Sequence, residues 1–234
     1  MSLILAIETA TPVCSVALLT GGRILGLKET REKNSHAAVV TVFIDELLRE
    51  QGLEPSDLDA VAVSKGPGSY TGLRIGVSTA KGLCYALDIP LISVGTLESM
   101  SAGMRSLLPG DEGMPVLLAP MIDARRMEVY TALFDPEGHH AKEVTAEIVT
   151  AESFSQYREN HLIYIAGDGA EKCREVLNHP NIRYMDGFEA SAVHMAAPAT
   201  TKFAEGIFEN TAYFEPYYLK DFIAGAPKVK GLRD

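Results

Sequence analysis

The sequence is poor in basic side chains, in cysteine and in long apolar runs. Its 234 residues include 31 aspartates and glutamates against 21 lysines and arginines, which gives a formal net charge of -10. Such a charge repels a phosphate backbone, so we expect no tight nucleic-acid binding by this chain alone. A part in nucleic-acid chemistry would have to rely on a partner.

Cysteines and membrane signals are equally sparse. Cys14, Cys84 and Cys173 lie far apart among apolar neighbours, which favours reduced core residues over a disulfide framework or a CxxC metal site. No apolar run approaches the roughly 18 residues that a membrane span needs. The N-terminus also lacks the basic flank of a signal peptide. We therefore expect a cytoplasmic protein that does not bind membranes.

What is present is a large apolar fraction, 47%, arranged in short segments between turns. This is enough for one large domain or two small lobes with buried cores. Apolar periodicity and turn residues predict three strands, then a helix, a strand, a helix, a strand and a small helix. The predicted strands are residues 3–7, 14–19, 24–28, 59–64 and 90–94, and the predicted helices are residues 36–50, 72–87 and a short one from 96.

The composition changes at residues 107–113, which favours a boundary between a first lobe, 1–106, and a second, 107–234. The second half again shows strands, at 116–122, 128–134 and 163–166, followed by a glycine turn and a helix ending near residue 178. A last helix, about 192–209, is expected to fold back on the first lobe. The pattern predicts an α/β protein made of two related halves.

The strongest local motif is the glycine-rich run of residues 64–76, SKGPGSYTGLRIG. Its free amides, between a strand and a helix, suit an anion, yet its glycines equally suit a tight turn that needs positive φ. It is not a P-loop, because Gly72 is followed by Leu73 and Arg74 instead of lysine and a hydroxyl residue. The spacing of the dinucleotide fingerprint also fails.

The two long helices carry surfaces with two open interpretations. Gly72, Gly76 and Gly82 each cost roughly 1 kcal/mol relative to alanine in a helix, so a smooth small-residue face must serve packing. That face packs either on the chain's own sheet or on a partner helix. The helix at 36–50 has an apolar arc over about half its circumference, wider than the roughly 100° that one packing surface needs, which favours a partner.

Four segments in this order resemble the TsaB family: residues 4–11, ILAIETAT; 14–18, CSVAL; 66–76; and 123–130, DARRMEVY. The similarity extends over nearly the whole chain and is most specific at residues 66–76. The resemblance implies a two-lobed actin-like ATPase fold, related to ribonuclease H, with a degenerate active site. One departure is Glu8, which stands where many relatives have aspartate.

The resemblance also implies vestigial phosphate-binding positions in the first turn, the glycine-rich run and a second glycine turn. They are Glu8, Thr9, Gly66, Gly68, Ser69, Gly167 and Gly169. No cofactor is expected beyond weak or vestigial binding of ATP or ADP.

Catalytic groups are not expected. The related catalytic subunit TsaD carries a His-x-x-x-His metal pair, and Thr96 and Met100 stand at those two positions here, so we expect no metal. The chain has no Gly-x-Ser-x-Gly elbow and no recognisable cysteine–histidine signature. The alternative function is an ATP-dependent small-molecule kinase, with Glu8 or Asp168 near the phosphates, or a protease of the same superfamily.

By resemblance, the chain is a non-catalytic subunit that binds and activates TsaD. TsaD transfers threonylcarbamoyl to the adenosine beside the anticodon of tRNAs that read codons beginning with A. TsaE would bind the assembled pair, tRNA would be met only through the complex, and the chain alone would form a homodimer. The predicted interface residues are His36, Val40, Phe43, Leu47, Gly72, Ile75, Gly76, Thr79 and Leu83.

Gly76 and the pair Arg125–Arg126 lie at places where a partner could make contact. Gly76 is expected to be partly exposed in the free chain, so that a bulky replacement would weaken complexes and leave the fold stable. Arg125 and Arg126 follow Asp123 in a turn between strands, where they would either position an acidic partner surface or form a plain exposed turn.

Overall fold

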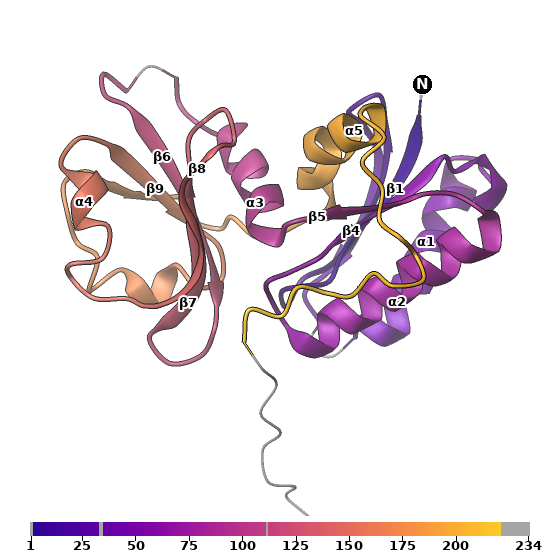
Figure 1. Ribbon diagram of the computed structural model, residues 1–234, viewed down its shortest axis with the longest axis horizontal. Coiled ribbons are helices and arrows are strands. Elements are labelled where there is room, and N and C mark those ends of the chain that lie inside the picture. Colours follow the sequence, from indigo (N-terminus) through magenta and orange to yellow (C-terminus); the bar gives the residue numbers. More distant parts are fainter. Residues whose placement is uncertain (1, 33–34, 111, 221–234) are drawn as a thin grey trace, which may run out of the picture.

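The computed structural model describes residues 2–32, 35–110 and 112–220. These residues form two lobes side by side, each built on a five-stranded mixed sheet (Figure 1). Residues 221–234, which fall within the expected second lobe, lie outside the described residues. In the part of the chain that is described, no helix combines the length and apolar character needed to span a bilayer.

The first sheet starts as a hairpin meander and continues with parallel strands. Its order is β3-β2-β1-β4-β5, with the first three strands antiparallel and the last two parallel to β1. All five residues of β4 are buried, as expected for a central strand covered on both faces. The strands are β1 (Leu3–Glu8), β2 (Cys14–Thr20), β3 (Arg23–Thr30), β4 (Ala60–Ser64) and β5 (Leu91–Val94).

Helices α1 (His36–Glu50) and α2 (Tyr70–Leu87) cover one face of this sheet (Figure 1). Their buried side chains join those of β1, β2 and β4 in one apolar core. Ser69 caps α2 by accepting a hydrogen bond from the Gly72 amide, and Asp88 ends the helix in the left-handed region. A short 3-10 turn, η1 (Pro55–Asp57), leads into β4.

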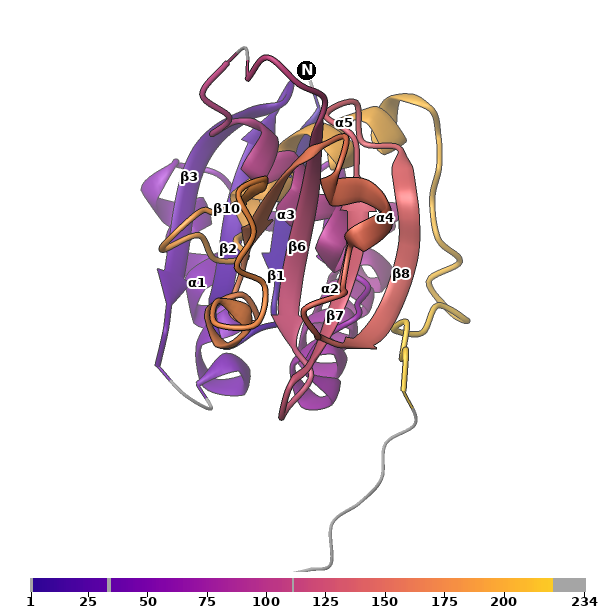
Figure 2. The same ribbon diagram turned by 90° about the vertical axis from the view of Figure 1, so that its left-hand side faces the viewer.

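The second sheet repeats the topology of the first (Figure 2). Its order is β10-β9-β6-β7-β8, again with an antiparallel meander followed by two parallel strands. The sequence pattern does not predict β8, because this edge strand is polar and only partly buried. The strands are β6 (Val116–Asp123), β7 (Glu128–Phe134), β8 (His140–Ile148), β9 (Leu162–Ala166) and β10 (Ile182–Tyr184).

The helices between strands differ greatly in length between the two lobes. Where the first lobe has α1 with 15 residues and α2 with 18, the second has α4 (Ser155–Arg158) and the 3-10 turn η2 (Glu171–Cys173). The predicted helix ending near residue 178 is therefore wrong beyond this one turn. The sheet topology is repeated without the long helices.

The last helix of each half packs on the sheet of the other half. α3 (Thr96–Arg105) buries Leu97, Met100 and Met104 against β6 and β7. The 3-10 turn η3 (Ala192–Met195) and α5 (Ala196–Ala204) bury apolar side chains against the first sheet. The expected helix over 192–209 therefore ends at Ala204. This exchange of helices joins the two lobes. A boundary at residue 106 therefore divides the chain between the two sheets, but α3 before it and α5 after it each belong to the core of the other lobe.

Residues 205–220, which we call the C-terminal strap, run back across β5 and α2 (Figure 1, yellow). Glu209 forms a bridge with Leu91 of β5, and the Lys81 ammonium donates to the carbonyls of Ala212 and Phe214. The Tyr217 amide then donates to the Lys65 carbonyl at 2.6 Å. The strap thus reaches the glycine-rich run and the space between the lobes.

Candidate functional site

The glycine-rich run packs against the β1–β2 turn of the same chain. The Ser69 amide donates to the Ala10 carbonyl at 2.7 Å, and the Gly72 amide donates to the Ser69 hydroxyl at 3.2 Å. A Cβ atom at Gly68 would lie 2.4 Å from the Ala10 carbonyl oxygen, and one at Gly66 would lie 2.5 Å from the Tyr217 carbonyl oxygen. The glycines Gly66 and Gly68 therefore permit close approach of backbone to backbone. The amides of Ser69 and Gly72 are already hydrogen-bonded within the chain.

Glu8 and Thr9 lie beneath this contact and are fully buried. One Glu8 oxygen, Oε1, accepts a hydrogen bond from the Ala10 amide at 2.7 Å. In the described residues, neither Glu8 Oε2 nor the Thr9 hydroxyl has a hydrogen-bond partner. Burial raises the pKa of Glu8 to about 7, against the lowering effect of its hydrogen bonds. This carboxyl therefore titrates near neutral pH rather than staying charged.

The second glycine turn is closed in a similar way. Gly167, with φ of 110°, would place a Cβ atom 2.3 Å from the Met121 carbonyl oxygen. A Cβ atom at Gly169 would lie 2.9 Å from the carbonyl carbon of Ile122. Asp168 between them is exposed and accepts a hydrogen bond from the Asp123 amide at 3.2 Å. Both glycines are thus occupied by packing against the end of β6.

A cleft of about 810 Å³ opens between the glycine-rich run and the second glycine turn, and the C-terminal strap closes it on one side. Of the residues predicted to bind phosphate, Gly68 and Ser69 line it, and Glu8, Thr9, Gly66, Gly167 and Gly169 do not. The lining also includes side chains that the sequence did not single out as site residues, which come from β7 and the strap. They are Tyr130, Tyr217, Tyr218, Leu219 and Lys220.

Four of the predicted interface residues belong to the core of this chain. Val40 and Leu47 are each 1% exposed, and Gly72 and Gly76 are buried. A Cβ atom at Gly72 would lie 2.0 Å from the Thr9 carbonyl oxygen, and one at Gly76 would lie 2.2 Å from the Thr9 hydroxyl. The prediction of a partner contact is therefore wrong for these four, as is the expected exposure of Gly76, because α2 packs on the β1–β2 turn through its small residues.

The other five predicted interface residues lie at the surface of the two helices and are half-buried: His36, Phe43, Ile75, Thr79 and Leu83. His36 Nε2 lies 3.0 Å from the Thr11 carbonyl oxygen, which holds the start of α1 on the β1–β2 turn. Between them the helices expose Val42 and Tyr85, and a Cβ atom at Gly82 would have no neighbour within 4 Å. We call the solvent-facing side of α1 and α2 the outer helix face.

The two positions expected to replace metal-binding histidines face inward. Thr96 and Met100 are fully buried, and Met100 packs in the core beneath the second sheet. In residues 2–32, 35–110 and 112–220, no group of three or more histidine, cysteine or acidic side chains comes together. Burial raises the pKa of Cys14 and of Cys84 to about 11, so that both stay protonated thiols at neutral pH.

Comparison with known proteins places this geometry in a family. Residues 27–224 match the family model described as TsaD, tRNA N6-adenosine threonylcarbamoyltransferase. The chain is 31% identical over 229 residues to the tRNA threonylcarbamoyladenosine biosynthesis protein TsaB of Escherichia coli, covering 94% of this chain and 96% of that protein. This chain belongs to the TsaB family.

Two further relatives support that placement. The Bacillus subtilis protein of the same name is 40% identical to this TsaB-family chain over 131 residues, which cover 56% of this chain and 54% of that protein. The solved structure of YeaZ from Pseudomonas aeruginosa has a TM-score of 0.74 and 27% identity, and the match covers 94% of this chain and 100% of that one. The fold is the two-lobed actin-like fold.

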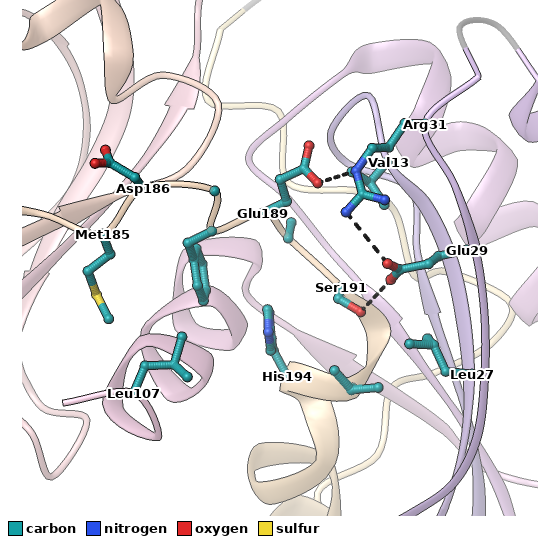
Figure 3. Close-up of a pocket in the computed structure, with 14 residues that line it drawn as sticks. Val13, Leu27, Glu29, Arg31, Leu107, Met185, Asp186, Glu189, Ser191 and His194 are labelled. Atoms are coloured by element: carbon teal, nitrogen blue, oxygen red, sulfur yellow. Dashed lines mark hydrogen bonds and ion pairs between the residues drawn. The ribbon is translucent and has the colours of Figure 1, made fainter. Parts of the chain in front are cut away.

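A second cavity of about 340 Å³ lies in this TsaB-family chain where the segment after β10 crosses back to the first lobe (Figure 3). Arg31 pairs with Glu189 of that segment and with Glu29, whose other oxygen accepts a hydrogen bond from the Ser191 hydroxyl at 3.1 Å. His194 stacks on Phe188 with ring centroids 4.9 Å apart, and burial lowers its pKa to about 4. These contacts hold the lobes together.

Proposed function

We propose that this chain is a non-catalytic subunit in tRNA threonylcarbamoyladenosine biosynthesis, which binds and activates the catalytic paralogue TsaD. The names of the Escherichia coli and Bacillus subtilis relatives support the pathway. The match to the TsaD family model supports descent from a common ancestor with the transferase. In this role the chain works in the cytoplasm.

The outer helix face carries the proposal. The second lobe builds the same sheet topology with a four-residue helix and a three-residue turn, so α1 and α2 are far longer than the sheet requires. Their outer side exposes apolar surface, with Val42 47% and Tyr85 87% exposed. Exposed apolar side chains on α1 and α2, together with the exposed Gly82, suit the close approach of partner helices. We assign this face to TsaD, with contacts that include His36, Phe43, Ile75, Thr79 and Leu83.

The complex transfers threonylcarbamoyl to the adenosine beside the anticodon of tRNAs that read codons beginning with A, and TsaE binds the assembled pair. Alone, the chain uses the same face to form a homodimer. No bound nucleotide is required of this subunit, because the glycines of both turns are packed against the chain's own backbone.

The test is a surface substitution that the fold tolerates. Gly82→Arg adds a long side chain on the outer helix face, and beyond its own helix backbone and chain neighbours nothing lies within 4 Å of its Cβ position. Relative to glycine it should raise helix stability by up to about 1 kcal/mol. A bulky group near an interface centre commonly costs at least about 2 kcal/mol, so the affinity for TsaD should fall more than about tenfold.

The matched control is Thr201→Arg, an exposed position on α5, which covers the opposite face of the first sheet. Light scattering on mixtures with TsaD, thermal melts and a tRNA modification assay should show loss of complex and activity for Gly82→Arg only. A wild-type chain that leaves TsaD monomeric and inactive would refute the function. Equal binding by both variants would refute this interface. Saturable binding of ATP with magnesium, coupled to hydrolysis, would favour the kinase alternative instead.

A further inference from the structure

The turn between β6 and β7, residues 124–127, presents two adjacent arginines in an unusual backbone conformation. We call it the arginine turn. Arg125 has φ of 73° and Arg126 has φ of 51°. The Glu128 amide closes the turn by donating to the Arg125 carbonyl at 3.1 Å. Positive φ crowds the side chain of every L-residue and is tolerated mainly by glycine, asparagine and aspartate, so arginine at both positions is disfavoured by local conformation.

Both arginines are exposed side chains of the described structure. In the described residues, no ion pair involves the side chain of Arg125 or Arg126. The flanking acidic residues are already paired, Asp123 with Lys172 and Glu128 with Lys220. The turn therefore presents two unmatched positive charges on a chain whose net charge is -10.

Aromatic rings lie around the same cleft. Arg125, Tyr130 and Tyr218 all line it, and the Tyr70 and Tyr218 rings are 4.9 Å apart. Lys220 lies 6.0 Å from the centre of the Tyr130 ring. Cationic groups beside aromatic rings are typical of surfaces that hold single-stranded nucleic acid, and the arginine guanidinium suits phosphate oxygens.

We propose that the arginine turn contacts the phosphate backbone of the RNA substrate in the complex with TsaD, an inference that rests on the proposed function. The cleft is also lined by His36 and Ser69, at the starts of α1 and α2, so the turn stands at one end of the outer helix face. From there it reaches a substrate bound on the partner. Two arginines cannot overcome the acidic charge of the free chain, so the contact operates only in the complex.

The experiment measures the KM for tRNA of the complex at several salt concentrations. R125Q/R126Q removes two positive charges, and the control R23E changes the net charge by the same amount. Arg23 is exposed and pairs with Thr20 at the end of the first sheet far from Glu8. For R125Q/R126Q we expect an unchanged kcat, a KM raised about tenfold, and a salt dependence of log KM shallower by about 1.5, the value for two lost phosphate contacts. R23E should match the wild type.

A second variant, R125N/R126G, suits the left-handed conformation and should keep or raise the thermal melting temperature while showing the same KM defect. An unchanged KM and salt dependence in complexes that still form would overturn the proposal. Dissociation of TsaD by R125Q/R126Q would also overturn it, because the turn would then bind an acidic protein surface. Failure of the wild-type chain to bind TsaD would instead remove the proposed function and this inference together.

Discussion

The β1–β2 turn and the β6–β7 turn occupy the same place in two sheets of the same topology, and their surroundings are opposite. In the first lobe, α2 packs its glycines on the turn at Thr9, and Glu8 at the end of β1 is completely buried. In the second lobe, the described residues place the second glycine turn and the short η2 at the equivalent position. Asp123, which ends β6 as Glu8 ends β1, is exposed there and pairs with Lys172.

The difference shows what the long helix does. A five-stranded sheet of this topology stands in the second lobe with hardly any helix in the equivalent position, so the topology by itself does not require a helix as long as α2. Its inner side seals the β1–β2 turn, and its outer side offers a surface for a partner. In the second lobe the β6–β7 turn is exposed to solvent, and Arg125 and Arg126 lie in it.

The largest loss of stability should come from disrupting the packing of α2 on the β1–β2 turn. Gly72→Ala places a Cβ atom 2.0 Å from the Thr9 carbonyl oxygen, where backbone must move. We expect a loss of about 3 to 4 kcal/mol in unfolding free energy, at the upper end for overpacking. Gly82→Ala on the outer side of α2 should instead add up to about 1 kcal/mol. Urea titrations of both variants check this, and equal stabilities would mean that α2 does not seal the turn.

The next effect is the pH dependence that the buried carboxyl imposes. The pKa of Glu8 is raised from 4.5 to about 7, so its contribution to stability is full below about pH 4.5 and is lost as pH rises towards 7. Glu8→Gln cannot ionise and should match the wild type at pH 4.5. At pH 8 it should be more stable by about 3 kcal/mol. Denaturation curves at the two pH values test the difference, and a constant offset between the proteins would contradict it.

The smallest effect should come from the equivalent residue of the open turn. Asp123→Asn removes the ion pair with Lys172 and keeps the side-chain volume. Because both side chains are partly exposed, we expect a loss of at most about 1 kcal/mol. Thermal melts at low and high salt would measure it. A loss as large as that of Gly72→Ala would show that the open turn is as tightly coupled to its lobe as the sealed one.

Much of the fold follows from local patterns. The apolar periodicity of the buried strands β1, β2 and β4 and of the helix α1 is strong, and clear turn residues bound them, so their predicted limits agree with the structure within a residue or so. The polar strand β8 escapes this prediction, and the helix predicted after Gly169 shrinks to a 3-10 turn. Both errors arise where local propensity is weak and packing between distant segments decides the outcome.

The candidate site is less predictable from the sequence than the fold. The glycines of residues 66–76 form a clear motif. From the sequence, some of them are predicted to bind phosphate and others to contact a partner helix. Periodicity identifies a small-residue face without identifying what packs against it. Here Thr9 and Ala10, some 60 residues earlier in the chain, fill that face. The tyrosines of the strap carry no local signal that would bring them to the cleft.

The sequence by itself determined the family, the two related halves and the acidic charge, because these depend on residue identity and order along the chain. Only the tertiary structure decided which glycines are buried, which carboxyl titrates near neutral pH and which arginines have no ion pair among the residues that the structure describes. Burial and pairing depend on segments far apart in sequence. The two turns show this most clearly, since each follows a strand that ends in an acidic residue, yet Glu8 is buried and Asp123 is exposed.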